Sequence, residues 1–225
     1  MAHLILASAS PRRRELLALL GLDFTVWPTA VGEEPLTHER PAALALRLAL
    51  AKARSAFCEA CAAMPDRQLV IASDTVVALG DEPLGKPRDA AEAAIMLRRL
   101  RGRVHQVHTA VALLGPTGCV SEVALTSVRM RRYSERELAA YVASGDPLDK
   151  AGAYAIQHPV FRPVREYWGC YANVMGLPLC HLTRCLRGFG IAPPVDVAAA
   201  CQAHTGRPCR VHRAILVGQP GISPL

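Results

Sequence analysis

Residues 4–13 read Leu4-Ile5-Leu6-Ala7-Ser8-Ala9-Ser10-Pro11-Arg12-Arg13. The first four are apolar and predict a short buried strand. Ser10 is a typical N-cap and Pro11 fits the first position of a helix, so we expect a helix to begin here and to end at Gly21. A buried strand that leads directly into a helix is typical of an α/β fold.

The patterns that follow predict more strands and helices. We expect helices from Pro41 onward, over residues 89–100, from a capping box at Ser134 as far as Gly145, and from residue 177 to near Gly188. Strands are expected over 69–79, interrupted at Ser73-Asp74-Thr75, and as an antiparallel pair over 104–114 and 122–132. A turn at 80–83 and a loop over 146–157 separate these elements. Together they predict an α/β fold around a mixed sheet.

The character of the chain changes near residue 190. Pro193-Pro194 interrupt it, and residues 191–225 show no clear long periodicity. We therefore divide the chain into a domain over 1–190 and an appended segment over 191–225. Four residues of that segment are possible zinc ligands, but two C-x-x-H units are a weak match to known zinc spacings, so we favour an incidental grouping. They are Cys201, His204, Cys209 and His212.

Composition narrows the possible classes of protein. Of 225 residues, 51% are hydrophobic, so the chain is globular, and no apolar run is long enough to span a membrane. The Arg12-Arg13-Arg14 cluster follows the apolar stretch, the reverse of a secretory signal, which predicts a cytoplasmic protein whose eight cysteines are free, buried thiols. The net charge of +7 fits phosphates, nucleotides or nucleic acid as partners, or only a basic surface.

The helix start at Ser10 is the first candidate site. The free N–H groups and positive dipole end of a helix bind phosphate well. Arg12 and Arg13 in the first turn are unfavourable beside that dipole unless an anion arrives, and Ser8 adds a hydroxyl. We interpret this turn as an anion site, and the alternative is a solvated basic helix start.

Asp74 is the second candidate, because an unpaired carboxylate inside an apolar strand is costly. It must face solvent, pair with a cation or hold a metal. Lys86 and the Glu33-Glu34 pair are weaker candidates on loops. Small residues around Gly152 would let a ligand approach the backbone closely, although a tight loop with a structural ion pair is an alternative.

Taken together, the ordered motifs resemble the Maf family of nucleotide pyrophosphatases over about residues 4–190. The motifs are Ser8-x-Ser10-Pro11-Arg12-Arg13, Arg47-Leu48-Ala49-x-x-Lys52-Ala53, Ser73-Asp74-Thr75, Gly85-Lys86-Pro87, Thr109-Ala110-Val111, Asp149-Lys150-Ala151-Gly152-Ala153-Tyr154 with Gln157, and Gly176-Leu177-Pro178. The resemblance implies an elongated mixed sheet flanked by helices, with two lobes and a central cleft, often in a homodimer. It also implies hydrolysis of a nucleoside triphosphate to the monophosphate and pyrophosphate.

The resemblance further implies a role for each matched residue. Asp74 falls on the family's general base and on a metal position, and Glu33 on a carboxylate near the metal, which is expected to be Mg²⁺ or Mn²⁺. Substrate would be bound by Ser8, Arg12, Arg13, Lys52, Thr75, Lys86 and Gln157. Arg12, Thr75 and Gln157 are similar to the subgroup that acts on dTTP and UTP. His158 stands where a glycine is usual, and residues 158–171 match the pattern poorly.

Two rival hypotheses remain open. One is the same chemistry on another base, such as a modified purine nucleotide. The other is a nucleic-acid-binding protein, suggested by the positive charge; with aromatics at 5% and no recognisable nucleic-acid module, we expect no stable complex of that kind. The expected partner is therefore a small-molecule nucleotide, with no membrane.

Overall fold

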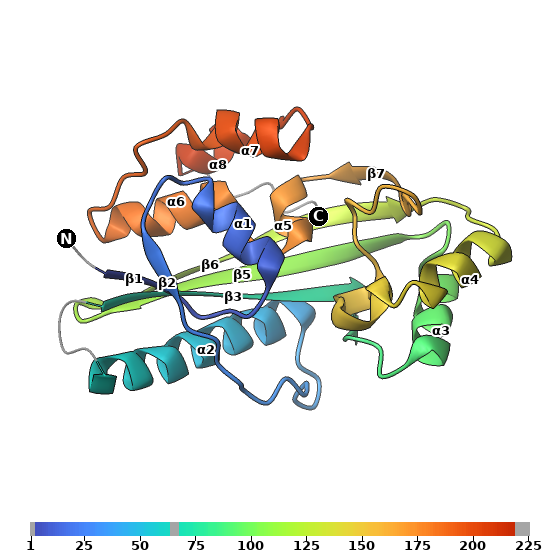
Figure 1. Ribbon diagram of the computed structural model, residues 1–225, viewed down its shortest axis with the longest axis horizontal. Coiled ribbons are helices and arrows are strands. Elements are labelled where there is room, and N and C mark those ends of the chain that lie inside the picture. The colour runs from blue at the N-terminus through green and yellow to red at the C-terminus, as the bar shows by residue number, and fades with distance from the viewer. Residues whose placement is uncertain (1–2, 64–67, 219–225) are drawn as a thin grey trace.

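A computed structural model describes residues 3–63 and 68–218 of the chain. Its centre is a mixed sheet in the order β2-β1-β3-β5-β6-β7, with β4 paired to β3 (Figure 1). The strands are β1 (His3–Leu6), β2 (Phe24–Val26), β3 (Gln68–Leu79), β4 (Glu82–Leu84), β5 (Val104–Gly115), β6 (Gly118–Met130) and β7 (Val164–Trp168). β1 runs parallel to β2 and β3, and the other neighbouring pairs of this sheet are antiparallel. The expected mixed α/β fold is confirmed.

The helices cover both faces of the sheet and one of its ends (Figure 1). α2 (Pro41–Ala63) packs on one face against β3 and β5. The other face carries α1 (Pro11–Ala18), α5 (Tyr171–Met175), α6 (Leu179–Gly188), α7 (Val197–Thr205) and α8 (His212–Leu216). A second lobe at the far end of the long strands holds α3 (Ala90–Leu100), α4 (Glu135–Ala143) and two 3-10 turns, η1 (Asp146–Asp149) and η2 (Ala151–Ala153).

β1 is buried on both faces, which explains its uninterrupted apolar sequence. Successive side chains of a strand point to opposite faces. Leu4 and Leu6 therefore enter the large core that includes α1, whereas Ile5 and Ala7 enter a second core beneath α2. This double burial fixes the end of β1, and with it the position of Ser8.

Two helix starts are confirmed where the sequence predicts them. The Ser10 side chain accepts a hydrogen bond from the Arg13 backbone N–H, with Pro11 at the first turn of α1. Ser134 and Glu137 form a reciprocal capping box at the start of α4. Local chemistry alone is sufficient to place these two ends.

The strand expected over 69–79 is confirmed as β3, and the polar residues Ser73-Asp74-Thr75 do not break it, because each of them pairs with a residue of β5. Other expectations about the elements were wrong in detail. β6 begins at Gly118 and ends at Met130, rather than spanning 122–132. The loop over 146–157 contains η1 and η2, and residues 82 and 83 of the expected turn belong to β4. The short elements β2, β7 and α5 were missed, since three to five residues carry too little periodicity to be recognised.

The segment after residue 190 is more ordered than its sequence suggests. It forms α7 and α8, which bury Val197 and Ile215 against the domain. The Arg184 side chain of α6 donates to the backbone carbonyl of Ile215 at 3.0 Å. The described part of the segment is therefore packed on the domain, while residues 219–225 lie outside the described residues.

The expectation of buried thiols holds for only part of the chain. Cys58, Cys61 and Cys119 are exposed, whereas the other cysteines are buried or half-buried, and all eight are free. Cys58 and Cys61 lie on α2, among the residues that face away from the sheet. Within the described residues, no helix is both long and apolar enough to cross a membrane.

Candidate functional site

The corner between β1 and α1 presents backbone N–H groups and hydroxyls together. Ser8 is buried at the end of β1, and its Oγ accepts a hydrogen bond from the Ser10 backbone N–H at 3.2 Å. The first turn of α1 contains no acidic residue that would neutralise its positive dipole end. The corner therefore has the features of a phosphate site.

The two arginines of this turn have different surroundings. The Arg13 guanidinium is held by the protein, since Nε donates to the Gly176 carbonyl at 2.9 Å and Nη2 donates to Thr75 Oγ1 at 3.1 Å. Burial lowers the pKa of Arg13, and the nearby Asp74 charge opposes that shift. Arg12 is freer, with an ion pair to Asp149 at 3.8 Å. Arg12 is thus better placed to contact a substrate, while Arg13 ties the corner to β3.

Asp74 lies at one end of a chain of alternating charges that continues through Lys52 and Glu33 to Lys86. Lys52 Nζ donates to Asp74 Oδ1 at 2.6 Å and to Glu33 Oε1 at 2.7 Å. Lys86 Nζ donates to the second oxygen of Glu33 at 3.1 Å. Both Asp74 and Lys52 are buried, with side-chain exposures of 9% and 10%. The buried carboxylate that the sequence indicated is therefore paired with a cation, one of the three environments we expected for it.

The Glu33 side chain is 44% exposed, and its partial loss of water contact would by itself raise the pKa of its carboxyl group. Hydrogen bonds and charge attraction from Lys52 and Lys86 outweigh that effect, so the pKa of Glu33 lies below its ordinary value. Glu33 therefore stays ionised at neutral pH, next to Asp74. Lys52 thus brings together Glu33 and Asp74, two carboxylates that are far apart in the sequence.

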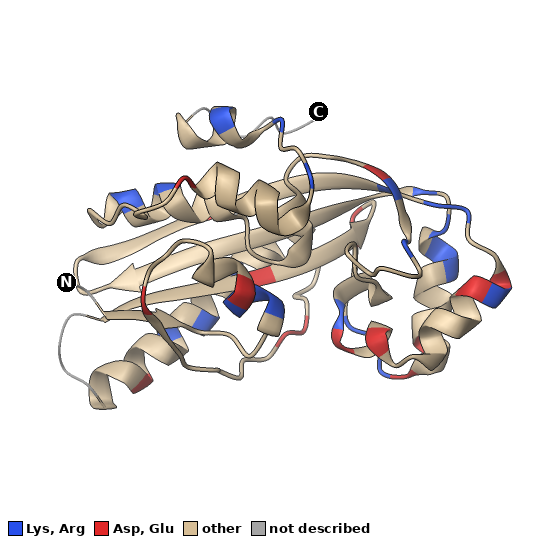
Figure 2. Cartoon of the chain, turned by 45° about the horizontal axis from the view of Figure 1, so that its top comes forward, with Lys and Arg blue, Asp and Glu red and all other residues tan. Residues whose placement is uncertain are grey.

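The Asp74 cluster and the α1 corner lie on opposite faces of β3. Asp74 faces α2 and its Lys52, whereas Thr75 faces α1 and bonds Arg13. The two groups are nevertheless neighbours, because Thr75, which binds Arg13 at 3.1 Å, directly follows Asp74 in β3. Figure 2 shows acidic and basic positions mixed over this middle part of the molecule. The enzyme hypothesis requires Asp74 to lie near the α1 corner, and the structure places it there.

Several residues that support the site had no role in the sequence prediction. Thr109 on β5 bonds Thr75 at 3.0 Å and donates to the Asn173 carbonyl. Ser73 donates to the Gly176 carbonyl, which also accepts from Arg13. Ser73 and Thr109 are both polar residues inside apolar strands, the same signal that identified Asp74.

Gln157 is the predicted site residue that the structure leaves apart. It is exposed, and no hydrogen bond or ion pair among the described residues joins it to Asp74, Thr75 or Arg12. It follows η2 in the chain. Its expected contact with a base stays a prediction.

The surroundings of Gly152 favour a packing role for this residue, and close approach of a ligand here stays a prediction. Gly152 has a φ of +68°, and a Cβ at this position would lie 2.8 Å from Val77 Cγ1. The close neighbour is thus β3 of the protein itself. Nearby, buried Lys150 bonds Asp146 at 3.0 Å and also contacts Asp149, which pairs with Arg12. This agrees with the alternative of a tight loop with a structural ion pair.

The possible zinc ligands of the C-terminal segment are not gathered. No group of three or more His, Cys, Asp or Glu side chains in residues 3–63 and 68–218 is arranged to hold a metal ion. His212 Nδ1 instead lies 2.9 Å from the backbone carbonyl of Cys209. Asp74 and Glu33 likewise offer only two carboxylates, so a cation there would need ligands from the substrate or water.

Known proteins resemble this chain closely. It matches the profile of the family described as "Maf-like protein" over residues 3–189. It is 47% identical over 194 residues to a dTTP/UTP pyrophosphatase of Thermomicrobium roseum, covering 85% of this chain and 87% of that one. It is also 47% identical over 195 residues to a protein of the same name from Moorella thermoacetica, covering 85% and 97%.

Among solved structures, a nucleoside-triphosphatase described as a dITP/XTP pyrophosphatase from Mycobacterium abscessus has a TM-score of 0.36 and 20% identity. It covers 58% of this chain and 73% of its own, and so slight a likeness supports no argument. The family profile and the two relatives are stronger evidence, because each of them spans most of the chain. The chain belongs to the Maf-like protein family.

Proposed function

We propose that this protein hydrolyses nucleoside triphosphates to the monophosphate and pyrophosphate, with dTTP and UTP as its first substrates. The observation that carries the proposal is buried Asp74, which shares Lys52 with Glu33 beside the N-terminus of α1. A water-directing carboxylate and a polyphosphate-binding corner are what attack at the α-phosphorus requires. The relatives named dTTP/UTP pyrophosphatase support the choice of substrate.

Each side chain has a role in this proposal. Asp74 orients or deprotonates the attacking water. Ser8 and the first-turn N–H groups of α1 bind phosphate oxygens, and Arg12, Lys52 and Lys86 offset the charge of the triphosphate and the leaving pyrophosphate. Arg13 acts by positioning the corner and Thr75 rather than through a free guanidinium. Thr75 and Gln157 contribute to recognition of the base.

The donor set fits a divalent cation. Asp74 and Glu33 each offer a carboxylate oxygen to one shared nitrogen, so the two oxygens lie close together. Mg²⁺ commonly takes one or two carboxylates and completes its shell with phosphate oxygens and water. Mg²⁺ or Mn²⁺ held by Asp74 and Glu33 would supply charge neutralisation at the triphosphate. The finer expectations, a cytoplasmic location and a homodimer, are part of the same proposal.

The test is hydrolysis of a nucleotide panel, with both the monophosphate and pyrophosphate measured. Wild-type protein with Mg²⁺ should cleave dTTP and UTP, and Asp74→Asn should lower kcat about a hundredfold or more. Asp81→Asn, at an exposed turn, is the matched control and should leave kcat unchanged. Near-normal turnover by Asp74→Asn would remove Asp74 from the mechanism. Preferential cleavage of a modified purine nucleotide would instead support the rival substrate.

A further inference from the structure

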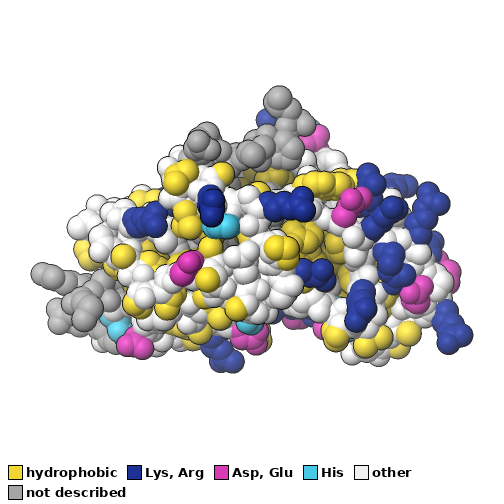
Figure 3. Space-filling view, turned by 90° about the horizontal axis from the view of Figure 1, so that it is seen from above, with side chains coloured by type: hydrophobic (Ala, Val, Ile, Leu, Met, Phe, Trp, Pro, Cys, Tyr) yellow, Lys and Arg dark blue, Asp and Glu magenta, His cyan; other side chains and the backbone are white. Residues whose placement is uncertain are grey.

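The positive charge of the chain is concentrated in three short segments, 98–103, 129–137 and 162–168. They contain ten arginines and three glutamates, an excess of seven that equals the formal net charge of the whole protein. The rest of the sequence is therefore balanced. The segments are neighbours in space, because Gly102 N–H bonds the Arg131 carbonyl and Arg131 N–H bonds the Pro163 carbonyl. Figure 3 shows Lys and Arg side chains most densely gathered over one end of the molecule, with others scattered over the rest of the face.

Half of these arginines have no carboxylate partner in the part of the chain that the structure describes. Arg98 and Arg101 share Glu135, Arg129 pairs with Glu166, and the pairs of Arg99 and Arg131 are with other glutamates. No ion pair within residues 3–63 and 68–218 involves the remaining five, which are Arg103, Arg132, Arg136, Arg162 and Arg165. All five are exposed. The positive charge of these three segments is thus not neutralised by carboxylates of the protein itself.

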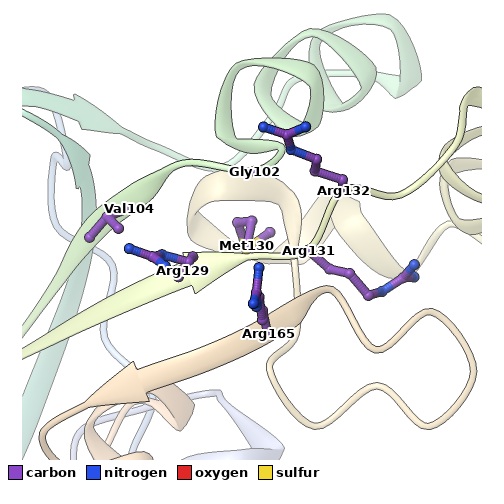
Figure 4. Close-up of a pocket in the computed structure, with 7 residues that line it drawn as sticks. All are labelled: Gly102, Val104, Arg129, Met130, Arg131, Arg132 and Arg165. Atoms are coloured by element: carbon purple, nitrogen blue, oxygen red, sulfur yellow. The ribbon is translucent and has the colours of Figure 1, made fainter.

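Four of the arginines line one surface hollow of about 720 Å³, which we call the arginine hollow: Arg129, Arg131, Arg132 and Arg165, around Met130. It lies at the end of β6, between the edge strand β7 and the segment that follows α3 (Figure 4). The four side chains extend in different directions rather than converging on one point. A single small anion could not contact all of them, whereas an extended polyanion could.

An exposed aromatic ring borders the arginine hollow. Trp168, the last residue of β7, is 47% exposed, and the Arg129 guanidinium lies 5.5 Å from its ring centroid. Sites for single-stranded nucleic acid combine a positively charged groove with aromatic rings on which bases stack. A duplex keeps its base faces covered and could not use the ring in this way. Arginine also suits phosphate, because its guanidinium donates two parallel hydrogen bonds.

We propose that the arginine hollow, together with Trp168, binds single-stranded nucleic acid through its phosphodiester backbone. The binding is electrostatic and reversible, so it weakens steeply with salt. The hollow is separate from the Asp74 cluster and shares no residue with it. This surface is not apparent from the low overall aromatic content or from the absence of a nucleic-acid module in the sequence.

The experiment measures fluorescence anisotropy of a labelled oligothymidylate of about 20 nucleotides, with the full chain, at several salt concentrations. Each lost phosphate contact reduces the slope of log K against log salt by about 0.7. Arg132→Gln with Arg165→Gln should therefore lower the slope by about 1.4 and weaken binding about fivefold or more. Trp168→Leu should weaken binding about fivefold or more without changing the slope.

The matched control is Arg40→Gln with Arg54→Gln, which removes two exposed arginines outside the three segments and should change neither quantity. Melting temperatures verify folding, and Arg165→Gln alone replaces the double variant if that variant unfolds. The proposal is overturned if the hollow variants bind the oligonucleotide as wild type does, or if a duplex binds equally well. It is also overturned if pyrophosphate displaces the oligonucleotide at an equal concentration of phosphate groups. None of these outcomes bears on triphosphate hydrolysis.

Discussion

Lys52 is the residue on which both candidate carboxylates depend. Its ammonium is almost fully buried and bonds Asp74 and Glu33 at once. Removal of one partner from a buried ion pair is far more costly than removal of the pair, because the remaining charge is left uncompensated. The position of Lys52 on α2 therefore links the stability of the protein to the integrity of the site.

We expect Lys52→Met to lower the free energy of unfolding by about 3 kcal/mol and to abolish most activity. Methionine keeps the unbranched apolar stem of the side chain but removes the ammonium group, so Asp74 is left without its cation. Adding Asp74→Asn to this variant should restore much of the stability but none of the activity. Urea unfolding measures the first quantity and pyrophosphate release the second. Equal unfolding free energies for wild type and Lys52→Met would contradict the central role of this pair.

Much of the site could be predicted at this scale. Asp74 and Ser8 carry strong local signals, namely a carboxylate inside an apolar strand and a hydroxyl at a strand-to-helix corner. The distribution of roles between Arg12 and Arg13 could not be predicted, because the Gly176 carbonyl that holds Arg13 comes from a distant part of the sequence. The place of Gln157 likewise depends on how the second lobe folds, which no local pattern determines.

At the scale of elements, the second lobe is held against β3 by the close approach of η2. Gly152 supplies both a left-handed backbone and the absence of a side chain next to Val77. Its N–H also donates to the Gly85 carbonyl, on the segment that carries Lys86. Packing at this one residue therefore connects η2 to the loop that contributes to the site.

Gly152→Ala should destabilise the protein by about 1–3 kcal/mol more than Gly80→Ala does. The two glycines have nearly the same φ, +68° and +65°, so both variants carry a similar backbone strain. A Cβ at Gly80 meets nothing within 4 Å, whereas one at Gly152 would overlap Val77. Chemical denaturation of the two variants side by side isolates the contribution of packing. The interpretation fails if the two glycines respond alike.

The predictability of the elements follows from their length and their caps. Helices that begin at Ser10 and Ser134 were located because an N-cap acts through residues three positions away. β2 and β7 were missed, because β2 is stabilised by its pairing with β1 and β7 by its pairing with β6. Tertiary partners stabilise such short strands, and a sequence pattern does not reveal those partners.

At the scale of the whole molecule, residues 191–218 lie outside the family match but inside the fold. The match ends at residue 189, whereas α7 and α8 bury Val197 and Ile215 and accept hydrogen bonds from two arginines of α6. This covering lies over α6 rather than over the Asp74 cluster. We therefore expect the segment to support stability without taking part in chemistry.

A chain shortened to residues 1–190 should lose about 3 kcal/mol or more of unfolding free energy, since burial of an aliphatic side chain contributes about 1.5–3 kcal/mol. Its kcat for dTTP should be unchanged at temperatures where it stays folded.

A matched pair of substitutions in the full chain tests whether the lost stability comes from packing of buried side chains rather than from the shorter chain. Ile215 is 4% exposed and Val217 is 72% exposed. Ile215→Ala should cost about 2–4 kcal/mol, whereas Val217→Ala should stay within about 0.5 kcal/mol. If the shortened chain melts at the same temperature as the full chain, α7 and α8 contribute nothing to stability and the segment needs another explanation.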